Sequence, residues 1–456
     1  MASSRVLVRE HTELTAAVAL KPIARISHIV AVAGLTFATR VGIYLAISSH
    51  WKFEQLLPWD GWGRIALLMS KGYGLADDHL MTYFPLSAPA PTASRPPVPV
   101  LLFAAVLKLF GEQLLPIIVT QALLEAGTAA LIYIIVKKMF ERGTFVNGFV
   151  NNSLAQGTAF VAAAGFAFFA PEWPYAIGFQ SEPVYTFLLT SAMAFVLLSD
   201  SRRSLIFSGI LFGLAALARP SILVFPALLV PWLIWGRHIS WKQAILLPAM
   251  MVLVLIPWGV RNYVVFHHAI FTETLAGYNL YRNSTQIEQD NYIRFVSGEE
   301  GNPKILKMLQ SKGLSPETIS EPDLDKLLRT EAIKVILARP GRYINLCAHR
   351  ALWLFYDADA GREFSPVLPL VYFAFTFALL AMTAVALWRF RGPWVRQFMP
   401  LWMLFIYIIP IHAMIVSQVR YFLPLVPVFL CVAAYGAVRS YLGLRTSLTS
   451  RVGKTA

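Results

Sequence analysis

The stretch that decides the fold is the apolar run SHIVAVAGLTFATRVGIYLAIS at residues 27–48, followed closely by the polar turn PWDGWGR at residues 58–64. As a helix, the run is long enough to cross the roughly 30 Å hydrocarbon core of a bilayer. The turn places Asp60 in a segment, residues 51–95, that is rich in charges and glycines and ends in a Pro/Ala/Ser/Thr tract. A membrane helix followed by an elaborate polar loop is therefore the pattern from which the rest of the chain is interpreted.

The composition indicates a polytopic membrane protein. Of the 456 residues, 57% are hydrophobic and 14% are charged, whereas soluble domains carry about 25% charged residues. The formal net charge of +14 would suggest nucleic-acid binding in a soluble protein. In a membrane protein, lysines and arginines instead hold cytoplasmic loops against anionic lipid, so we expect membrane lipids and no nucleic acid as partners.

Further apolar runs predict an all-α polytopic membrane protein with about ten transmembrane helices, because about 20 residues suffice for each crossing. The expected spans are residues 27–48, 114–136, 154–170, 183–199, 204–218, 221–235, 243–258, 366–388, 398–415 and 422–438. The first has no cleavage site after it and is expected to be a retained helix. The apolar run at 98–110 is too short to span, so we expect an interfacial helix there.

The distribution of lysine and arginine predicts the orientation. With the N-terminus inside, the short inner segments hold 18 of these residues and the short outer segments hold 6, which agrees with the positive-inside rule. Both termini are then cytoplasmic, in a bacterial inner membrane. The expected segments are a cytoplasmic segment (1–26), a membrane domain (27–258) with a catalytic outer loop (51–97), an extracytoplasmic helical segment (259–363), three last spans (364–440) and a basic cytoplasmic tail (441–456).

The extracytoplasmic segment carries helix signals of its own. Ser320, followed by Pro322 and Asp323, predicts a helix start. Pro340-Gly341 predicts the end of that helix, and a second amphipathic helix is expected from Ile344 to Tyr356.

Polar side chains at membrane depth are costly and are therefore candidates for function. Such residues gather at the outward ends of the expected spans, whereas the inner face shows no comparable set of acids. This one-sided distribution predicts an active site that faces the outer compartment. The candidates are Asp60, Arg95, Glu182, Arg219, Arg261, Arg420 and Tyr421, with Arg64 and His412 as further site candidates.

Structural explanations compete with function at several of these positions. Asp60 is equally suited to cap a helix over Gly61–Ser70, and Arg64, four residues later, is suited to pair with it. Glu182 precedes Pro183 and is suited to cap the next span.

The remaining candidates also have structural alternatives. Arg219 is suited to anchor a loop, Arg261 to reach toward the interface, and His412 to hydrogen-bond between helices. Asp77-Asp78-His79 resembles a metal cluster, but we expect a solvated turn there.

Taken together, the motifs resemble those of the GT-C superfamily of lipid-dependent membrane glycosyltransferases. The resemblance is greatest to the protein-mannosyltransferase-like branch (glycosyltransferase family 39), which includes aminoarabinose transferases and RgtA/B/C/D-like transferases. It is carried, in order, by Trp59-Asp60, Arg95-Pro96-Pro97-Val98-Pro99, Gln180-Ser181-Glu182-Pro183, the stretch from Gly213 to Pro220, Pro257-Trp258-Gly259-Val260-Arg261-Asn262-Tyr263, and the stretch from Arg420 to Pro427.

The resemblance implies transfer of a sugar from a polyprenyl-phosphate donor to a cell-envelope acceptor, with Asp60 as the catalytic base. Arginines suit the leaving phosphate because they make charge-assisted, often bidentate hydrogen bonds. The expected phosphate- or lipid-binding residues are Arg95, Arg219, Arg261, Arg420 and Tyr421. Many members carry a second acid beside the first; here Gly61 follows Asp60, so no paired-acid motif supports a divalent metal and no metal ligands are predicted.

Two other function classes remain open. A transporter or flippase would suit the number of spans, although transporters place polar residues near the bilayer midplane in broken helices. An O-antigen-type ligase or polymerase would also use a lipid-phosphate-linked glycan, and the late outer segment is basic enough for one. The early Asp60 segment and Arg95-Pro96-Pro97 favour the transferase.

Overall fold

The computed structural model describes residues 22–47, 51–142, 152–289, 296–355, 367–389 and 399–455. Residues 1–21 of the expected cytoplasmic segment lie outside these ranges. The same holds for the expected segment boundary at residue 363 and for the loop arginines Arg391 and Arg396.

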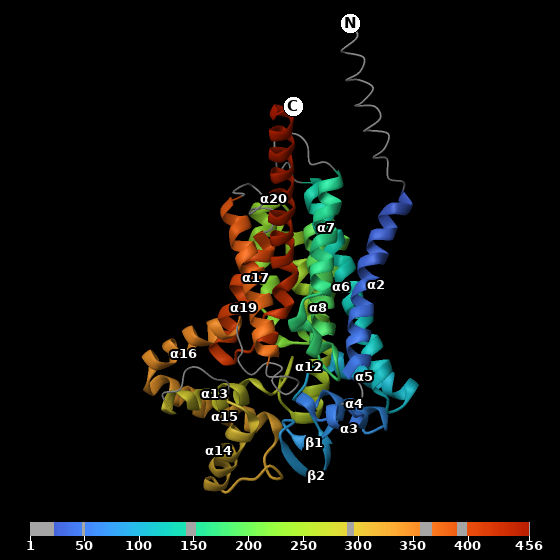
Figure 1. The fold of residues 1–456 in the computed structure, drawn as a ribbon. Helices are drawn as coiled ribbons and strands as arrows, with labels where there is room; N and C mark the ends of the chain where they lie inside the picture. Colours follow the sequence, from blue (N-terminus) through green and yellow to red (C-terminus); the bar gives the residue numbers. More distant parts are fainter. Residues whose placement is uncertain are drawn as a thin grey trace.

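Helices lie in the range of each expected span and form a bundle, while the number of them that cross a membrane stays a prediction. They are α2 (Pro22–Ile47), α6 (Leu114–Arg142), α7 (Asn152–Ala167), α8 (Glu182–Leu198), α9 (Arg202–Ala216), α10 (Phe225–Pro231) with its continuation η5 (Trp232–Gly236), α11 (Trp241–Ala244) with α12 (Leu246–Phe266), α17 (Leu368–Arg389), α19 (Met399–Ile415) and α20 (Val426–Thr455). The start of α2 and the end of α20 lie at the same end of the bundle (Figure 1). The sheet and helices α13 to α16 lie at the opposite end.

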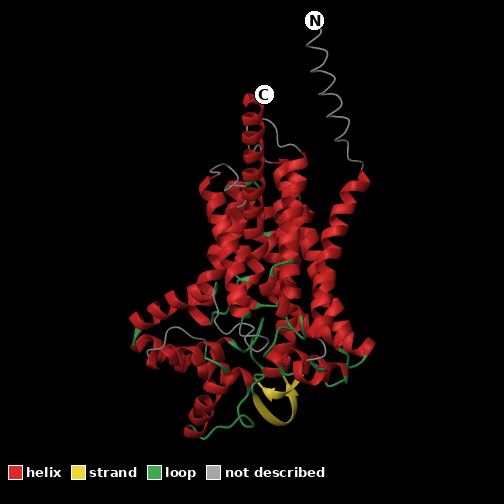
Figure 2. Ribbon diagram, in the orientation of Figure 1, coloured by secondary structure: helices red, strands yellow, loops and turns green. Residues whose placement is uncertain are grey.

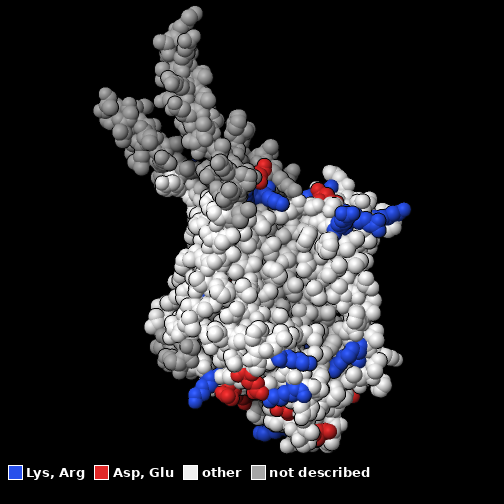
Figure 3. Space-filling view, turned by 90° about the vertical axis from the view of Figure 1, so that its right-hand side faces the viewer, with Lys and Arg blue, Asp and Glu red and all other residues white. Residues whose placement is uncertain are grey.

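The bundle has the surface of a membrane protein. Among the described residues, five helices are long and apolar enough to cross a membrane, or six if the bent pair of α7 and η3 (Ala170–Ala176) forms one span. The helices α8 and α19 are apolar but shorter. In Figure 3 the visible charged side chains gather near the two ends and leave a broad uncharged band between them. The chain is therefore a multi-pass membrane protein.

The first outer loop is built from short elements packed beneath the bundle. They are α3 (Phe53–Leu56), the single turn η2 (Trp59–Gly61), α4 (Trp62–Ser70), β1 (Ala76–Leu80), β2 (Phe84–Pro91) and α5 (Pro97–Phe110). Helix α5 occupies the range expected for the interfacial helix. Its buried face, with Val100 and Phe103, shares an apolar cluster with Trp62 and Ile65 of α4.

The first outer loop adds one two-stranded antiparallel sheet, which the sequence did not predict, to an otherwise helical fold (Figure 2). The strands lack a clear alternation of apolar residues, and β2 contains prolines, which sheets accept at edges. Tertiary packing explains the strands: Leu80, Met81 and Phe84 are buried in one cluster with Leu324 and Leu328 of the outer segment.

The outer segment folds into α13 (Ala276–Gln289), α14 (Gly298–Ser311), α15 (Glu321–Ala338) and α16 (Pro340–Trp353). The expected helix start is confirmed, because the Ser320 side chain accepts a hydrogen bond from the Asp323 amide at the first turn of α15. The expected second helix begins earlier than predicted, at Pro340, because a proline is well suited to the first turn of a helix.

A buried arginine inside the helix bundle contacts the C-terminal end of α7. Arg40 of α2 is 1% exposed and pairs with Glu125 of α6. Its other guanidinium nitrogens donate to the carbonyls of Ala167 (2.7 Å) and Phe166 (3.3 Å). These are carbonyls that the end of a helix leaves without an intrahelical partner. The pair thus stabilises the break after α7 that leads, through η3, to the polar start of α8.

Close packing between α9 and α12 depends on two glycines four residues apart. A Cβ on Gly209 would lie 2.4 Å from the carbonyl oxygen of Leu247, and one on Gly213 would lie 2.6 Å from Cβ of Val254. Small residues at this spacing allow membrane helices to approach closely.

We expect Gly209→Ala to lower the free energy of unfolding by about 1–3 kcal/mol, because the added methyl group overpacks the α9–α12 contact. Reversible unfolding in mixed detergent micelles measures the change. Gly34→Ala is the matched control, since a Cβ at Gly34 of α2 meets nothing within 4 Å. Equal effects of the two substitutions would contradict the prediction.

Candidate active site

A cavity of about 300 Å³ lies where the first outer loop, the outer segment and the ends of α8, α9 and α19 meet. Its polar side is formed by residues that the sequence places far apart. They are Asp60, Arg95, Ser181, Arg219, Glu273, His412, Arg420 and Tyr421. Five of the predicted candidates beside Asp60 (Arg95, Arg219, His412, Arg420 and Tyr421) therefore line one cavity.

Asp60 is held in an unusual backbone turn. Its φ is 54°, in the left-handed region, and that of Gly61 is 76°. Left-handed conformations cost energy for residues with a Cβ, and aspartate is among the residues that adopt them most readily. A Cβ on Gly61 would lie 2.0 Å from Cγ2 of Thr82, so a glycine is required beneath the β1–β2 turn. The N-cap of α4 is Gly61, which rules out the alternative of Asp60 as the cap of this helix.

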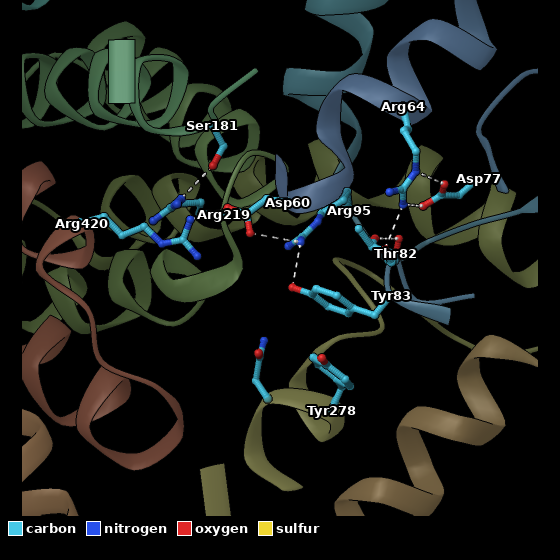
Figure 4. Close-up of polar contacts among 12 residues, drawn as sticks. Asp60, Arg64, Asp77, Thr82, Tyr83, Arg95, Ser181, Arg219, Tyr278 and Arg420 are labelled. Atoms are coloured by element: carbon cyan, nitrogen blue, oxygen red, sulfur yellow. Dashed lines mark hydrogen bonds and ion pairs between the residues drawn. The ribbon is translucent and has the colours of Figure 1, made fainter. Parts of the chain in front are cut away.

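The Asp60 carboxylate instead faces two arginines. One oxygen accepts a hydrogen bond from Nη1 of Arg420, and the other lies 3.9 Å from Nη2 of Arg95. Figure 4 shows Asp60 flanked by Arg95 on one side and by Arg219 and Arg420 on the other. Burial alone would raise the pKa of Asp60, but Arg420 and Arg95 outweigh it and hold that pKa well below its usual range.

Arg219 is positioned by the start of α8. Its Nε donates to the Ser181 hydroxyl at 2.9 Å, and its Nη2 lies 2.5 Å from Glu182. The Glu182 side chain has no exposed surface. Its pairing with Arg219, with Arg420 3.9 Å away, shows that it does more than start a helix, which was the competing explanation. Glu182 thus holds Arg219 in place by an ion pair and lies close to Arg420.

Tyr421 contacts two of the arginines and His412 through its ring. Its ring stacks on His412 with centroids 4.2 Å apart, and both the Arg219 and Arg420 guanidinium carbons lie over it, at 5.3 and 5.4 Å. Cation–π contacts of this kind stabilise guanidinium groups at sites with little water. On its apolar side the cavity continues along Leu223 and Val224.

The arrangement is suited to an anion. Three guanidinium groups, those of Arg95, Arg219 and Arg420, meet two ion-paired carboxylates, those of Asp60 and Glu182. Arg95 Nε and Arg420 Nε are buried and have no hydrogen-bond partner among the described residues. Buried donors without partners are costly, so a ligand that accepts hydrogen bonds and carries negative charge would complete the site.

Arg64 does not pair with Asp60, contrary to the sequence-based alternative, and it does not line the cavity. Its Nε lies 3.0 Å from Asp77 and 3.1 Å from Asp78, and its Nη2 donates to the Thr82 carbonyl at 2.9 Å. The Asp77 side chain is fully buried. Arg64 therefore fastens the sheet to α4.

The Asp77-Asp78-His79 stretch is a strand with a buried acid, which corrects the expected solvated turn. Its three ligand atoms lie within 4.8 Å of one another. Arg64 already supplies a positive charge to both carboxylates, and the Asp78 carboxylate also contacts His79 at 2.7 Å.

Arg261 lies on the wall behind the site and does not line the cavity. Its guanidinium donates to the carbonyls of Thr92 (2.9 Å) and Leu75 (3.0 Å) and lies over the Trp258 ring at 5.1 Å. It thus fixes the segment that leads to Arg95. Its predicted contact with a donor phosphate stays a prediction.

Two residues at or beside the site are not among the candidates predicted from the sequence. Glu273, in a polar segment with no motif, lines the cavity, and Tyr83 accepts a hydrogen bond from Arg95 at 3.3 Å. Neither carries a local signal. Arg40 and Glu125 did carry one, because each is a charged residue within an apolar run.

Comparisons with known proteins agree with this architecture. Residues 94–260 match the family described as dolichyl-phosphate-mannose-protein mannosyltransferase. No curated protein sequence matches the chain.

Among solved structures, the chain is similar to the archaeal oligosaccharyltransferase AglB from Archaeoglobus fulgidus, which was solved with an inhibitory peptide and a dolichol-phosphate. The identity is 17% and the TM-score 0.52, and the match covers 94% of this chain and 52% of AglB. The chain thus spans about half the length of AglB. ArnT from Cupriavidus metallidurans, solved bound to undecaprenyl phosphate, is similar at 13% identity and a TM-score of 0.36, covering 92% of this chain and 78% of ArnT.

The fold is similar to that of AglB, which agrees with the GT-C-like fold that the sequence motifs predict. Over residues 94–260 the sequence is similar to that of the dolichyl-phosphate-mannose-protein mannosyltransferase family.

We expect Arg64→Gln to loosen the β1–β2 sheet, because it leaves the buried Asp77 carboxylate without a cation. Breaking a buried pair in this way costs about 3–5 kcal/mol. Hydrogen–deuterium exchange over residues 76–91 should increase. Lys71→Gln is the control, since Lys71 and Glu112 are both half exposed and such surface pairs contribute about 0–1 kcal/mol. Unchanged protection in Arg64→Gln would show that the pair is not needed.

Proposed function

We propose that this protein is an integral membrane glycosyltransferase that moves a sugar from a polyprenyl-phosphate donor to a cell-envelope acceptor. The cavity at Asp60 would be its active site, on the extracytoplasmic face of a bacterial inner membrane, with both termini cytoplasmic. The observation that carries the proposal is the group of three arginines beside an ion-paired aspartate, two of which, Arg95 and Arg420, have a buried Nε without a partner among the described residues. The donor lipid in the family name matched by residues 94–260 agrees with a lipid-phosphate substrate.

The chemistry follows from the charges in the cavity. An acceptor hydroxyl attacks the anomeric carbon, the bond from that carbon to the phosphate oxygen breaks, and the electron pair leaves with the polyprenyl phosphate. Charge therefore grows on the phosphate in the transition state, where preorganised guanidinium groups stabilise it most. A single displacement of this kind inverts the anomeric configuration.

The polyprenyl chain needs an apolar path out of the cavity. Leu223 and Val224 line the cavity and are 39% and 54% exposed on the surface of the bundle. Tyr407 of α19 accepts a hydrogen bond from the Val224 amide at 3.2 Å and closes the other side of this path. The lipid phosphate would then lie at the arginines while the isoprenoid chain passes between η4 (Pro220–Ile222) and α19 into the bilayer.

The proposal is tested by incubating membranes that contain the protein with radiolabelled undecaprenyl-phosphate sugars, beginning with mannose. Label should pass to a cell-envelope acceptor, and mass spectrometry of envelope glycans and lipids after gene deletion should identify it. Movement of the lipid-linked sugar across reconstituted vesicles without a covalent product would instead establish the transporter alternative.

We expect Asp60→Asn to reduce transfer at least 100-fold while the protein remains folded and inserted. Loss of the carboxylate charge leaves Arg420 and Arg95 without their shared partner, whatever Asp60 does to the acceptor hydroxyl. Initial rates at saturating donor measure the effect. Transfer at the wild-type rate would show that Asp60 has no part in the reaction, and its predicted role as base would be wrong.

Arg219→Gln and Arg420→Gln should each weaken binding of undecaprenyl phosphate about 10- to 100-fold, because a hydrogen bond to a charged group contributes about 1.5–3 kcal/mol. Isothermal titration of the purified protein in detergent measures the affinity. Arg203→Gln serves as control, since Arg203 is exposed in the first turn of α9 and does not line the cavity. Equal affinities of all three variants would exclude the arginine group as the phosphate site.

A further inference from the structure

Glu273 is held rigidly at the cavity although it belongs to no helix. The carbonyl of the preceding residue, Thr272, accepts a hydrogen bond from Trp258 Nε1 at 2.7 Å. The amide of the following residue, Thr274, donates to the Ala93 carbonyl at 3.1 Å, and its hydroxyl donates to Glu321. Contacts on both sides therefore fix the backbone of Glu273.

The same contacts bring Glu273 beside the first outer loop. Glu321 is 3% exposed and also accepts from the Thr92 hydroxyl and the Ala93 amide, both at 2.8 Å. It thereby joins the segment before Arg95 to the segment that carries Glu273. Glu273 lines the cavity that Asp60 and Arg95 line.

The two carboxylates of the cavity differ in their partners. Asp60 contacts Arg420 and Arg95. Glu273 is half-buried, and no hydrogen bond or ion pair ties it to a described residue. A carboxylate bound to two guanidinium groups is a poor proton acceptor, because a proton on it would compete with both of them. An unpaired carboxylate in the same cavity has its lone pairs available.

We propose that Glu273 is a catalytic residue that accepts the proton of the acceptor hydroxyl, while Asp60 stays ionised and keeps Arg420 and Arg95 in position. This inference rests on the proposed function. As the hydroxyl oxygen bonds to the anomeric carbon, its proton passes to the Glu273 carboxylate. The bond from carbon to phosphate oxygen breaks, and the phosphate keeps the electron pair. Glu273 then releases the proton to solvent through the cavity.

The charges around Glu273 agree with this role. Burial raises the pKa of Glu273 to about 7, against the lowering effect of Arg95 and Arg219 and with a small further rise from Asp325 of α15. The other titratable groups that share its cavity are Asp60, Tyr407, His412, Arg420 and Tyr421. A general base works best when its pKa lies near the operating pH. The pKa of Asp60 is held far below that range.

The sign of the pH dependence follows directly. Only the deprotonated Glu273 accepts a proton, so kcat should rise about tenfold per pH unit below its pKa and level off above it. Glu273→Gln should lower kcat by about 100- to 10,000-fold and abolish this rise. Glu273→Asp should recover part of the rate and retain a rise with pH. Binding of undecaprenyl phosphate should change less than about threefold in Glu273→Gln.

The experiment measures kcat and KM from pH 5 to 9 for the full-length protein, with the undecaprenyl-phosphate sugar that gives product in the transfer assay. Glu299→Gln, an exposed acid in the first turn of α14, is the matched control and should keep the wild-type profile. Asp60→Asn is measured in parallel, and its residual rate should keep the rise with pH.

Two results would overturn the inference. One is a wild-type kcat in Glu273→Gln, and the other is a loss of activity in this variant that lies entirely in the binding of undecaprenyl phosphate. Each of these leaves the proposed function intact, because the wild type still forms product. If the wild type forms no covalent product with any donor, the proposed function fails and the inference falls with it.

Discussion

The contact between Asp60 and Arg420 is the interaction on which the rest of the site depends. It joins residues 360 positions apart, one in the first outer loop and one at the start of the last membrane helix. Neither charge is freely solvated, with side-chain exposures of 24% and 18%, so each needs the other to offset the cost of desolvation. The cavity exists only when the two ends of the chain are brought together around this pair.

Two further ion pairs within the helix bundle explain how the bundle supports the contact between Asp60 and Arg420. Arg40 with Glu125 stabilises the break after α7, and Glu182 with Arg219 joins the start of α8 to the end of α9. Each of these pairs contains a carboxylate that is almost fully buried, and removal of one partner would leave an uncompensated charge. The helices therefore cannot shift along one another without separating charges, and this keeps the cavity arginines in a fixed geometry, as the proposed catalysis would require.

The sequence could predict what depends on local composition. Apolar runs of sufficient length placed the helices, and charges at their outward ends identified Asp60, Arg95, Arg219 and Arg420. It could not predict which charges meet. Arg64 and Asp60 have helical spacing, yet Arg64 pairs with Asp77, because Asp60 lies in a left-handed turn that directs its carboxylate away from α4. Which charged residues form ion pairs depends on tertiary contacts. The two strands depend on tertiary contacts as well, because their apolar residues pack against α15, which is distant in the sequence.

Glu273 is a second case in which the sequence could not predict a tertiary arrangement. Nothing in its local sequence distinguishes it from the exposed acids of the outer segment, and tertiary contacts of Thr272 and Thr274 with Trp258, Ala93 and Glu321 hold it at the cavity. Two carboxylates in one cavity can take distinct roles when their environments give them different pKa values. Guanidinium groups around Asp60 favour its charged form, whereas burial favours the neutral form of Glu273 and outweighs the opposite effect of Arg95 and Arg219. The outer segment therefore does more than cover the site, because it supplies the carboxylate whose charge can change near neutral pH.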